Sequence, residues 1–250
     1  MKKLFIFDYD RTIAQPVSVP SKEMLHELEG ILEGNIIAIM SGGRTYDQVN
    51  ALLIKNLSRK KKLPLQNFYV APFYGNTIFQ WDAETPILKY KAEEMAEETK
   101  NEIYNALRGI QEGKSIGGEL NKMKTIDKGQ YISINCLGGA FTKEEREAWD
   151  TDKVKRQKLK NYLDGELQGK LEVYVTGRAT VDIIPKGKNK AENSKRLAKM
   201  LDIELKNVLY FGDEFEVYGN DYPLLSVKGI HINVVKNPEE TLEILKPFKV

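Results

Sequence analysis

The sequence predicts a doubly wound α/β core built from both ends of the chain, with an α+β domain inserted between them. Short apolar runs alternate with helical patterns near the N-terminus, the middle changes character, and the first rhythm then resumes. The 250 residues exceed one average domain, and the 41% of apolar residues can fill a packed core. We therefore assign residues 1–84 and 186–250 to the core and residues 85–185 to the inserted domain.

The first third of the chain is expected to alternate strand and helix. Residues 4–7 (Leu-Phe-Ile-Phe) form an apolar run without alternation, which is typical of a strand buried on both faces. Residues 35–40 and 68–71 have the same character. Ser21 can cap a helix between the first two strands, and a second helix is expected at residues 45–57. Strands joined through helices pair in parallel.

The middle of the chain indicates a different arrangement. A charged helix with one buried face is expected at residues 92–111, and residues 131–135 alternate as a half-exposed antiparallel strand does. The remaining elements of this domain are expected as a helix at 153–167 and strands at 171–176 and 179–184. The α/β rhythm then returns with a helix at 191–200, strands at 207–211 and 231–234, and a helix at 238–245.

Charge and cysteine content exclude several classes of protein. The 38 Lys and Arg residues against 36 Asp and Glu leave a net charge of +2, too even to indicate nucleic acid or a membrane as partner. The basic run at residues 59–62 fits a solvated turn, with a nucleic-acid contact as the alternative. The lone Cys136 cannot form an internal disulfide, and no signal-peptide pattern or membrane-length apolar run is present. A soluble cytoplasmic protein is expected.

Aspartates follow two of the predicted core strands. Asp8 and Asp10 come directly after the first strand, and on extended chain this spacing points both side chains the same way. Asp213 and Asp221 follow the strand predicted at 207–211. Ligands of open α/β sheets bind at the carboxyl ends of strands, so Asp8, Asp10 and Asp213 are expected to converge if the two strands are neighbours in the sheet. Such an oxygen-rich set suits Mg²⁺ better than Zn²⁺, and simple helix capping is the alternative interpretation.

Two further segments could handle a phosphate. Ser41 and Gly42 end the second strand just before a helix, where a hydroxyl and backbone N–H groups can bind an anion. Lys190 closes a basic turn that opens another helix, and a lysine there could neutralise a transferring phosphoryl group. Taken singly, a Ser-Gly turn is common loop chemistry and a lysine is usually a solvated surface charge.

In this order, the four segments resemble the motifs of the haloacid dehalogenase superfamily of aspartate-dependent phosphotransferases. The first motif is matched by Asp8-x-Asp10-x-Thr12, the second by Ser41, the third by Lys190, and the fourth by Gly212-Asp213 with Asn220-Asp221. The resemblance implies a Rossmann-like parallel-sheet core, bound Mg²⁺ and an aspartyl-phosphate formed on Asp8. It implies that Asp10 is the general acid and base, that Ser41, Gly42 and Lys190 hold the phosphate, and that Asp8, Asp10, Asp213 and Asp221 bind the metal.

The insertion is similar to the large type IIB cap, and within that group to the cap of the eukaryotic-type phosphomannomutases. The likeness rests on Glu144-Glu145-Arg146, on Thr180-Val181-Asp182 and on the spacing from Asp213 to Asp221. It implies that the cap closes over the active site and touches the substrate through Lys128, Arg146, Thr180 and Asp182.

Several positions depart from the mutases. Arginines of that group are replaced by Val17 and Gly139, and a third falls on Lys128, which keeps the charge without bidentate geometry. Ser41 instead matches the residue type that many phosphatases of the superfamily have at this position. The expected function is therefore a Mg²⁺-dependent phosphohydrolase of a sugar phosphate or similar small phosphomonoester. The alternatives are a mutase that interconverts mannose 6-phosphate and mannose 1-phosphate, and a binding protein without turnover. A homodimer is left open.

Overall fold

The computed structural model describes residues 2–57, 62–82, 85–111, 120, 122–139, 141–167 and 169–248. They divide into two compact units. The first consists of Met1–Ala92, Asn189–Phe215 and Asp221–Val250, and the second of Glu93–Lys188 and Glu216–Asn220. The basic run at residues 59–62 lies outside the described residues except for Lys62. No helix of the described residues is long and apolar enough to cross a bilayer.

The first unit is built on a seven-stranded sheet with the order β11-β10-β1-β2-β3-β4-β5. Its strands are β1 (Leu4–Phe7), β2 (Ile36–Met40), β3 (Phe68–Ala71), β4 (Thr77–Gln80), β5 (Ile87–Lys91), β10 (Val208–Gly212) and β11 (His231–Val234). Strands β11, β10, β1, β2 and β3 pair in parallel, and β4 and β5 add an antiparallel hairpin at one edge. The parallel strands are apolar throughout except β11, as expected of strands covered on both faces.

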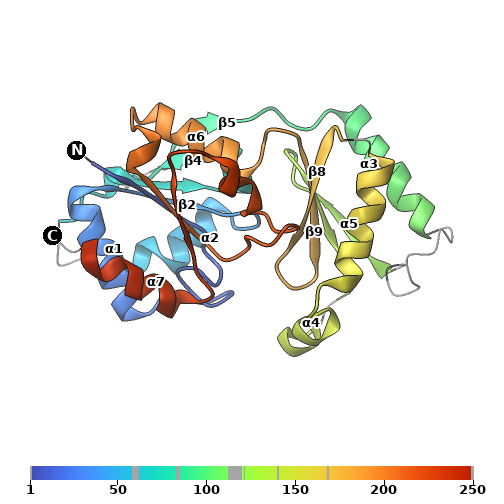
Figure 1. Ribbon diagram of the computed structural model, residues 1–250, viewed down its shortest axis with the longest axis horizontal. Coiled ribbons are helices and arrows are strands. Elements are labelled where there is room, and N and C mark those ends of the chain that lie inside the picture. Colours follow the sequence, from blue (N-terminus) through green and yellow to red (C-terminus); the bar gives the residue numbers. More distant parts are fainter. Residues whose placement is uncertain are drawn as a thin grey trace. The chain divides into compact units, whose positions relative to one another are not determined.

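Helices cover both faces of this sheet, which makes the unit doubly wound. The helices are α1 (Lys22–Gly34), α2 (Tyr46–Leu52), α6 (Lys190–Met200) and α7 (Pro238–Leu245). Phe5 and Phe7 pack with α1, α2 and α7, whereas the alternating Leu4 and Ile6 pack with α6. Helices α1 and α7 lie side by side (Figure 1). The predicted α/β class and the Ser21 cap of α1 are confirmed, with Ser21 Oγ accepting from Met24 N.

The second unit is an antiparallel sheet with helices on one face. Its strand order is β6-β7-β9-β8. Its elements are α3 (Glu97–Gln111), β6 (Lys124–Asp127), β7 (Ile132–Asn135), α4 (Lys143–Trp149), α5 (Val154–Glu166), β8 (Leu171–Thr176) and β9 (Thr180–Pro185). Alternate apolar residues of β7, β8 and β9 pack on α3 and α5. The opposite face of these strands carries polar side chains, which include Ser133, Thr176 and Asp182.

The structure differs from the sequence-based expectation at several elements. Strand β5 pairs with β4, so residues 87–91 join the first sheet and the division falls after residue 92 rather than 84. The strand expected to be half-exposed, β7, is largely buried because it lies between β6 and β9. The helix expected over 45–57 ends at Leu52 and continues as a short 3-10 turn. Strands β4, β5 and β6 and helix α4 were not predicted.

Gly138 illustrates how tightly the second unit is folded after β7. Its φ is +73°, and a Cβ atom there would lie 1.4 Å from the carbonyl oxygen of Lys122. Gly169 has the same φ, but a Cβ atom there meets nothing within 4 Å. We expect Gly138→Ala to lower the free energy of unfolding by about 2 kcal/mol or more, from backbone strain plus the clash. Urea denaturation of both Gly→Ala variants measures this, and equal losses would contradict the clash.

Candidate active site

Three neighbouring parallel strands bring the predicted motifs to one edge of the sheet. Asp8 follows β1, Asp213 follows β10 and Ser41 follows β2, and β1 is hydrogen-bonded to both other strands. Asp8 N continues this pairing by donating to Phe211 O at 2.9 Å. The carboxyl ends of parallel strands lie at one edge of the sheet, so the strand pairing places Asp8, Asp213 and Ser41 at the same edge.

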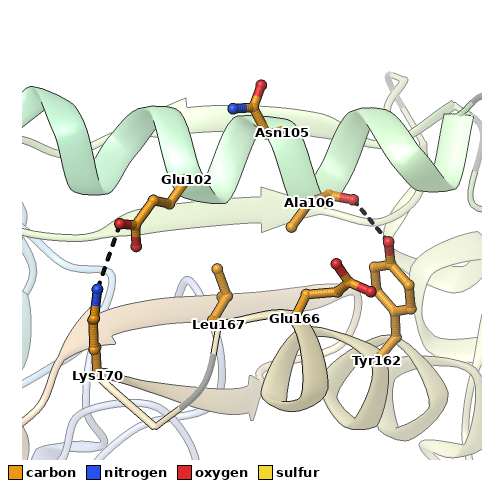
Figure 2. A pocket seen from close by; sticks show the side chains of 7 residues that line it. All are labelled: Glu102, Asn105, Ala106, Tyr162, Glu166, Leu167 and Lys170. Atoms are coloured by element: carbon orange, nitrogen blue, oxygen red, sulfur yellow. Dashed lines mark hydrogen bonds and ion pairs between the residues drawn. The ribbon is translucent and has the colours of Figure 1, made fainter.

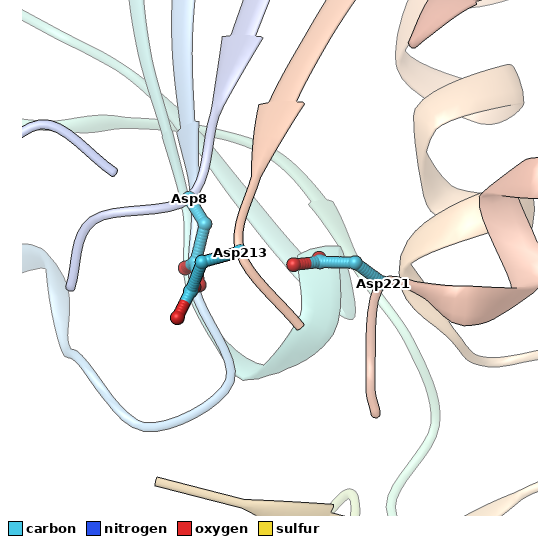
Figure 3. A group of neighbouring side chains, drawn as sticks. All are labelled: Asp8, Asp213 and Asp221. Carbon is cyan, nitrogen blue, oxygen red and sulfur yellow. The ribbon is translucent and has the colours of Figure 1, made fainter. Parts of the chain in front are cut away.

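An acidic cluster forms at this edge. Carboxylate oxygens of Asp8, Asp213 and Asp221 all lie within 4.8 Å of one another. Figure 3 shows the Asp221 carboxylate directed toward the other two. All three side chains are nearly or fully buried, with 11% of the Asp8 and 8% of the Asp213 side chain exposed and none of Asp221. Like charges held this closely and away from water repel unless a cation or protons offset them.

Lys190 is the protein's own cation within this cluster. Its fully buried Nζ lies 3.2 Å from Asp8 Oδ2 and 2.8 Å from Asp221 Oδ1. Burial by itself would lower the pKa of Lys190, but the charges of Asp221 and Asp8 outweigh it and raise this pKa above its ordinary value. Lys190 is therefore charged at physiological pH and lies beside the nucleophile that the sequence predicted.

Asp221 is held by the protein through both carboxylate oxygens. Besides Lys190, Oδ1 accepts from the buried Tyr210 hydroxyl at 2.6 Å, and Oδ2 accepts from Glu214 N at 3.1 Å. This pattern suits a group that orients Lys190, and metal ligation by Asp221 stays a prediction. Tyr210 was not predicted, because a tyrosine in an apolar strand has the appearance of an ordinary core residue. Its hydroxyl position becomes visible only once Asp221 is placed in space.

The remaining carboxylates of the cluster fit a divalent cation. Burial raises the pKa of both Asp8 and Asp213 well above the usual range of a carboxyl group. The charge of Asp221 adds to the rise in both pKa values, and the charge of Asp8 raises that of Asp213 further. Lys190 offsets only part of this cost. Hard oxygen donors in a small buried group are the ligands that Mg²⁺ prefers. Asp8 and Asp213 are therefore the residues most suited to hold Mg²⁺.

We expect Mg²⁺ to raise the melting temperature, and to raise it more at pH 8 than at pH 5.5. A carboxyl group whose pKa is raised by folding stabilises the folded state fully only below its unfolded pKa, and that contribution is lost as pH rises through the folded pKa. A bound cation replaces those protons at high pH and competes with them at low pH. Differential scanning fluorimetry with and without MgCl₂ measures the difference. An equal shift at both pH values would contradict this account.

The loop after β2 carries the predicted phosphate ligands. Ser41 and Gly42 are both buried, and a Cβ atom on Gly42 would lie 2.9 Å from the Tyr74 ring, so a larger residue there would force this ring to move. Helix α2 begins after this loop, at Tyr46. Its N-terminus is already capped by Thr45, which forms a reciprocal capping box with Gln48. The loop itself, and not the helix end, is therefore the feature that could bind a phosphate.

Asp10 lies apart from the acidic cluster and pairs with Arg44. Arg44 Nε donates to Asp10 Oδ2 at 3.1 Å, and Arg44 Nη2 donates to Asp10 Oδ1. Arg44 was not among the predicted site residues, although its place at the end of the run Ser41-Gly42-Gly43-Arg44 is a usable signal. Arg11 is a further cation at this edge, with Nη1 3.9 Å from both Asp213 Oδ2 and Glu214 Oε1.

The predicted substrate residues all lie in the second unit. Asp182 is buried and accepts from Ser133 Oγ at 2.6 Å and from Thr176 Oγ1 at 3.0 Å. Thr180, half-buried, is on the same face of β9, whereas Arg146 is exposed on α4 and Lys128 lies in the turn between β6 and β7. Only Thr180 and Asp182 thus share a surface by strand register, and the substrate contacts of all four residues stay predictions.

A separate cavity of about 410 Å³ lies between α3 and α5 in the second unit (Figure 2). It is lined by Glu102, Asn105, Ala106, Tyr162, Glu166, Leu167 and Lys170. Its polar groups already meet one another, with Lys170 Nζ 3.6 Å from Glu102 Oε1 and the Tyr162 hydroxyl donating to Ala106 O at 3.2 Å. None of the predicted site residues lines this cavity, so it gives no support to the chemistry described above.

Comparison with known proteins agrees with the motifs. A model of the haloacid dehalogenase-like hydrolase family matches residues 5–246. The phosphomannomutase of Encephalitozoon cuniculi is 23% identical over 96% of this chain and 91% of that protein. Phosphomannomutase 2 of Dictyostelium discoideum is 25% identical over 97% of this chain and 95% of that protein.

Solved structures share the fold. The N-terminally truncated IMP-nucleotidase of Plasmodium falciparum has a TM-score of 0.70 at 21% identity, covering 98% of this chain and 69% of that one. A haloacid dehalogenase-like hydrolase from Bacteroides thetaiotaomicron has a TM-score of 0.62 at 16% identity, covering 99% of this chain and 100% of that one. At these identities the likeness concerns the fold alone.

Proposed function

This chain belongs to the haloacid dehalogenase-like hydrolase family, and on that basis we propose that it is a Mg²⁺-dependent phosphohydrolase of sugar phosphates or similar small phosphomonoesters. The observation that carries the proposal is the buried contact of Lys190 with Asp8 at the carboxyl edge of the sheet. A carboxylate next to a fixed cation can attack a phosphorus atom whose negative charge the cation screens. The raised pKa of Asp8 and Asp213 adds a reason for a second, divalent cation.

In this proposal the reaction has two steps, both carried out by residues of the first unit. Asp8 attacks the phosphorus and the bond to the sugar oxygen breaks, while Asp10 protonates that departing oxygen. Asp10 then takes a proton from water, which attacks the aspartyl-phosphate and releases inorganic phosphate. Ser41 and Gly42 bind phosphate oxygens, and Lys190 neutralises their charge. Mg²⁺ bound by Asp8 and Asp213, with the backbone carbonyl of Asp10 as a further ligand by resemblance, would supply positive charge at the transferring group.

The alternative is a phosphosugar mutase, in which a second sugar hydroxyl takes the place of water. It is supported by the two phosphomannomutases that match over at least 91% of their length. Against it, two arginines of the mutases correspond here to Val17 and Gly139. Val17 is 82% exposed, so an arginine would have room at that position and its absence is not forced by packing. We therefore keep phosphohydrolase as the primary proposal.

Phosphate release from a panel of hexose phosphates tests the proposal, with Mg²⁺ and with or without a hexose bisphosphate. Steady release that is indifferent to the bisphosphate supports the phosphohydrolase. Isomerised sugar phosphate with little free phosphate, dependent on the bisphosphate, supports the mutase. Saturable binding of a sugar phosphate without either product supports a binding protein. The panel should include nucleoside monophosphates to define the substrate class.

The cellular setting is part of the same proposal. We infer a cytoplasmic enzyme that acts on a small molecule, because the even charge and the single, buried Cys136 suit a reducing compartment. We propose neither nucleic acid nor a membrane as its partner. Size-exclusion chromatography with light scattering distinguishes a monomer from a homodimer.

A further inference from the structure

Arg44 contacts Asp10, the proposed general acid and base, with two nitrogen atoms. Nε and Nη2 of Arg44 donate to Oδ2 and Oδ1 of Asp10, a planar two-point contact that fixes the plane and direction of the carboxylate. The Arg44 side chain is 9% exposed, whereas that of Asp10 is 40% exposed. Each carboxylate oxygen has a second lone pair, so this contact leaves Asp10 able to meet a reacting oxygen.

Arg44 is itself held from two sides. Its guanidinium lies 4.3 Å from the centre of the Tyr9 ring, a cation–π contact with the residue next to Asp10. Tyr9 is fully buried, its hydroxyl donates to Ser18 O at 2.9 Å, and burial raises its pKa to about 12, so the ring is a neutral phenol at physiological pH. Arg44 N also donates to Ser41 Oγ at 3.3 Å. Arg44 therefore ties the loop after β1 to the loop after β2.

From these contacts we propose that Arg44 is a positioning residue for Asp10, with the Tyr9 ring as its support. The inference rests on the proposed function, because it assigns to Asp10 the proton that the departing oxygen receives. A fixed carboxylate matters most when that oxygen is strongly basic, as in a sugar or other alkyl phosphate. It matters little for p-nitrophenyl phosphate, whose leaving group departs without protonation. Arg44 thus sets the enzyme's preference for alkyl over activated aryl phosphates.

The test compares kcat/KM for these two substrates in Arg44→Lys and Arg44→Met. The lysine keeps the charge but cannot make the two-point contact, and the methionine loses both. We expect kcat/KM for the alkyl phosphate to fall by about 10- to 100-fold in both variants, and that for p-nitrophenyl phosphate by less than about 3-fold. A loss of general folding or of phosphate binding would lower both values together.

Arg196→Met is the matched control. Arg196 belongs to the same unit, is partly buried and stacks on the Tyr90 ring at 4.5 Å, but it contacts no residue of the candidate site among the described interactions. Its substrate ratio should equal that of the wild type. An unchanged ratio in Arg44→Met, or a wild-type ratio in Arg44→Lys, overturns the proposal. Failure of the proposed function is distinct from this, because the wild-type enzyme would then release no phosphate from either substrate.

Discussion

Replacing Asp8 by asparagine is expected to abolish turnover and leave the protein folded. The amide has the size of the carboxylate but cannot attack phosphorus, and loss of a covalent nucleophile lowers kcat by at least about 10⁴-fold. Folding should not suffer, because the charged form of Asp8 is disfavoured by its burial, as its raised pKa indicates. We therefore expect a melting temperature at or above that of the wild type without Mg²⁺ at pH 8.

Two measurements check this expectation. Phosphate release gives the turnover, and incubation with ³²P-labelled substrate followed by acid quenching shows whether a phosphoryl group stays on the protein. Asp47→Asn is the control, since Asp47 is exposed in the first turn of α2, and its activity should be within about twofold of the wild type. Ordinary activity in folded Asp8→Asn protein would remove Asp8 as the nucleophile and with it the proposed mechanism.

The core of the fold was predictable because its strands are apolar on both faces. A run such as Leu4–Phe7 has few alternatives, and Ser21 marks the start of the next helix by its cap. Strands β5 and β6 escaped prediction for the opposite reason: β5 is almost wholly exposed and has lysines at two of its five residues, and β6 is exposed throughout. Helix α4 was not predicted although the sequence carries a signal for its start, the capping box of Thr142 and Glu145.

The candidate site likewise has a part that was predictable from the sequence and a part that was not. Parallel strands bring their carboxyl ends to one edge, so Asp8 was expected to approach Asp213 if their two strands were neighbours, and β1 does pair with β10. The partners of the individual oxygen atoms do not follow, because loops decide them. Asp10 and Asp8 are two residues apart, yet Asp10 pairs with Arg44 while Asp8 meets Lys190. A pattern of residue types therefore predicted the place of the site better than the contacts within it.

Lys190→Met is expected to damage activity and stability together. The variant removes the cation beside the nucleophile, and loss of such a charge lowers kcat by about 10²- to 10³-fold. It also leaves Asp8 and Asp221 without their buried counter-charge, which costs about 3–5 kcal/mol of unfolding free energy. Lys190→Arg should rescue neither property fully, because the Lys190 side chain is completely enclosed and a guanidinium needs more room.

The pH dependence of the unfolding free energy distinguishes the loss of the buried charge in Lys190→Met from the loss of ordinary core packing. The pKa of Lys190 is raised, so its stabilising charge is fully present below the unfolded lysine pKa and is lost only at more alkaline pH. Asp8, with its own raised pKa, can take up a proton as pH falls, which offsets part of the missing cation. Urea denaturation should therefore show a larger loss at pH 8 than at pH 5.5.

Lys195, on the same helix, provides the control for the stability loss of Lys190→Met. Lys195, 40% exposed, pairs with Glu192 on the surface of α6, and Lys195→Met should cost less than about 1 kcal/mol at either pH. If the two variants lost similar stability, or if the loss in Lys190→Met were independent of pH, the buried charges would not be coupled as their distances imply. A large, pH-dependent loss confined to Lys190 would instead tie the stability of the core to the same charges that are proposed to perform the chemistry.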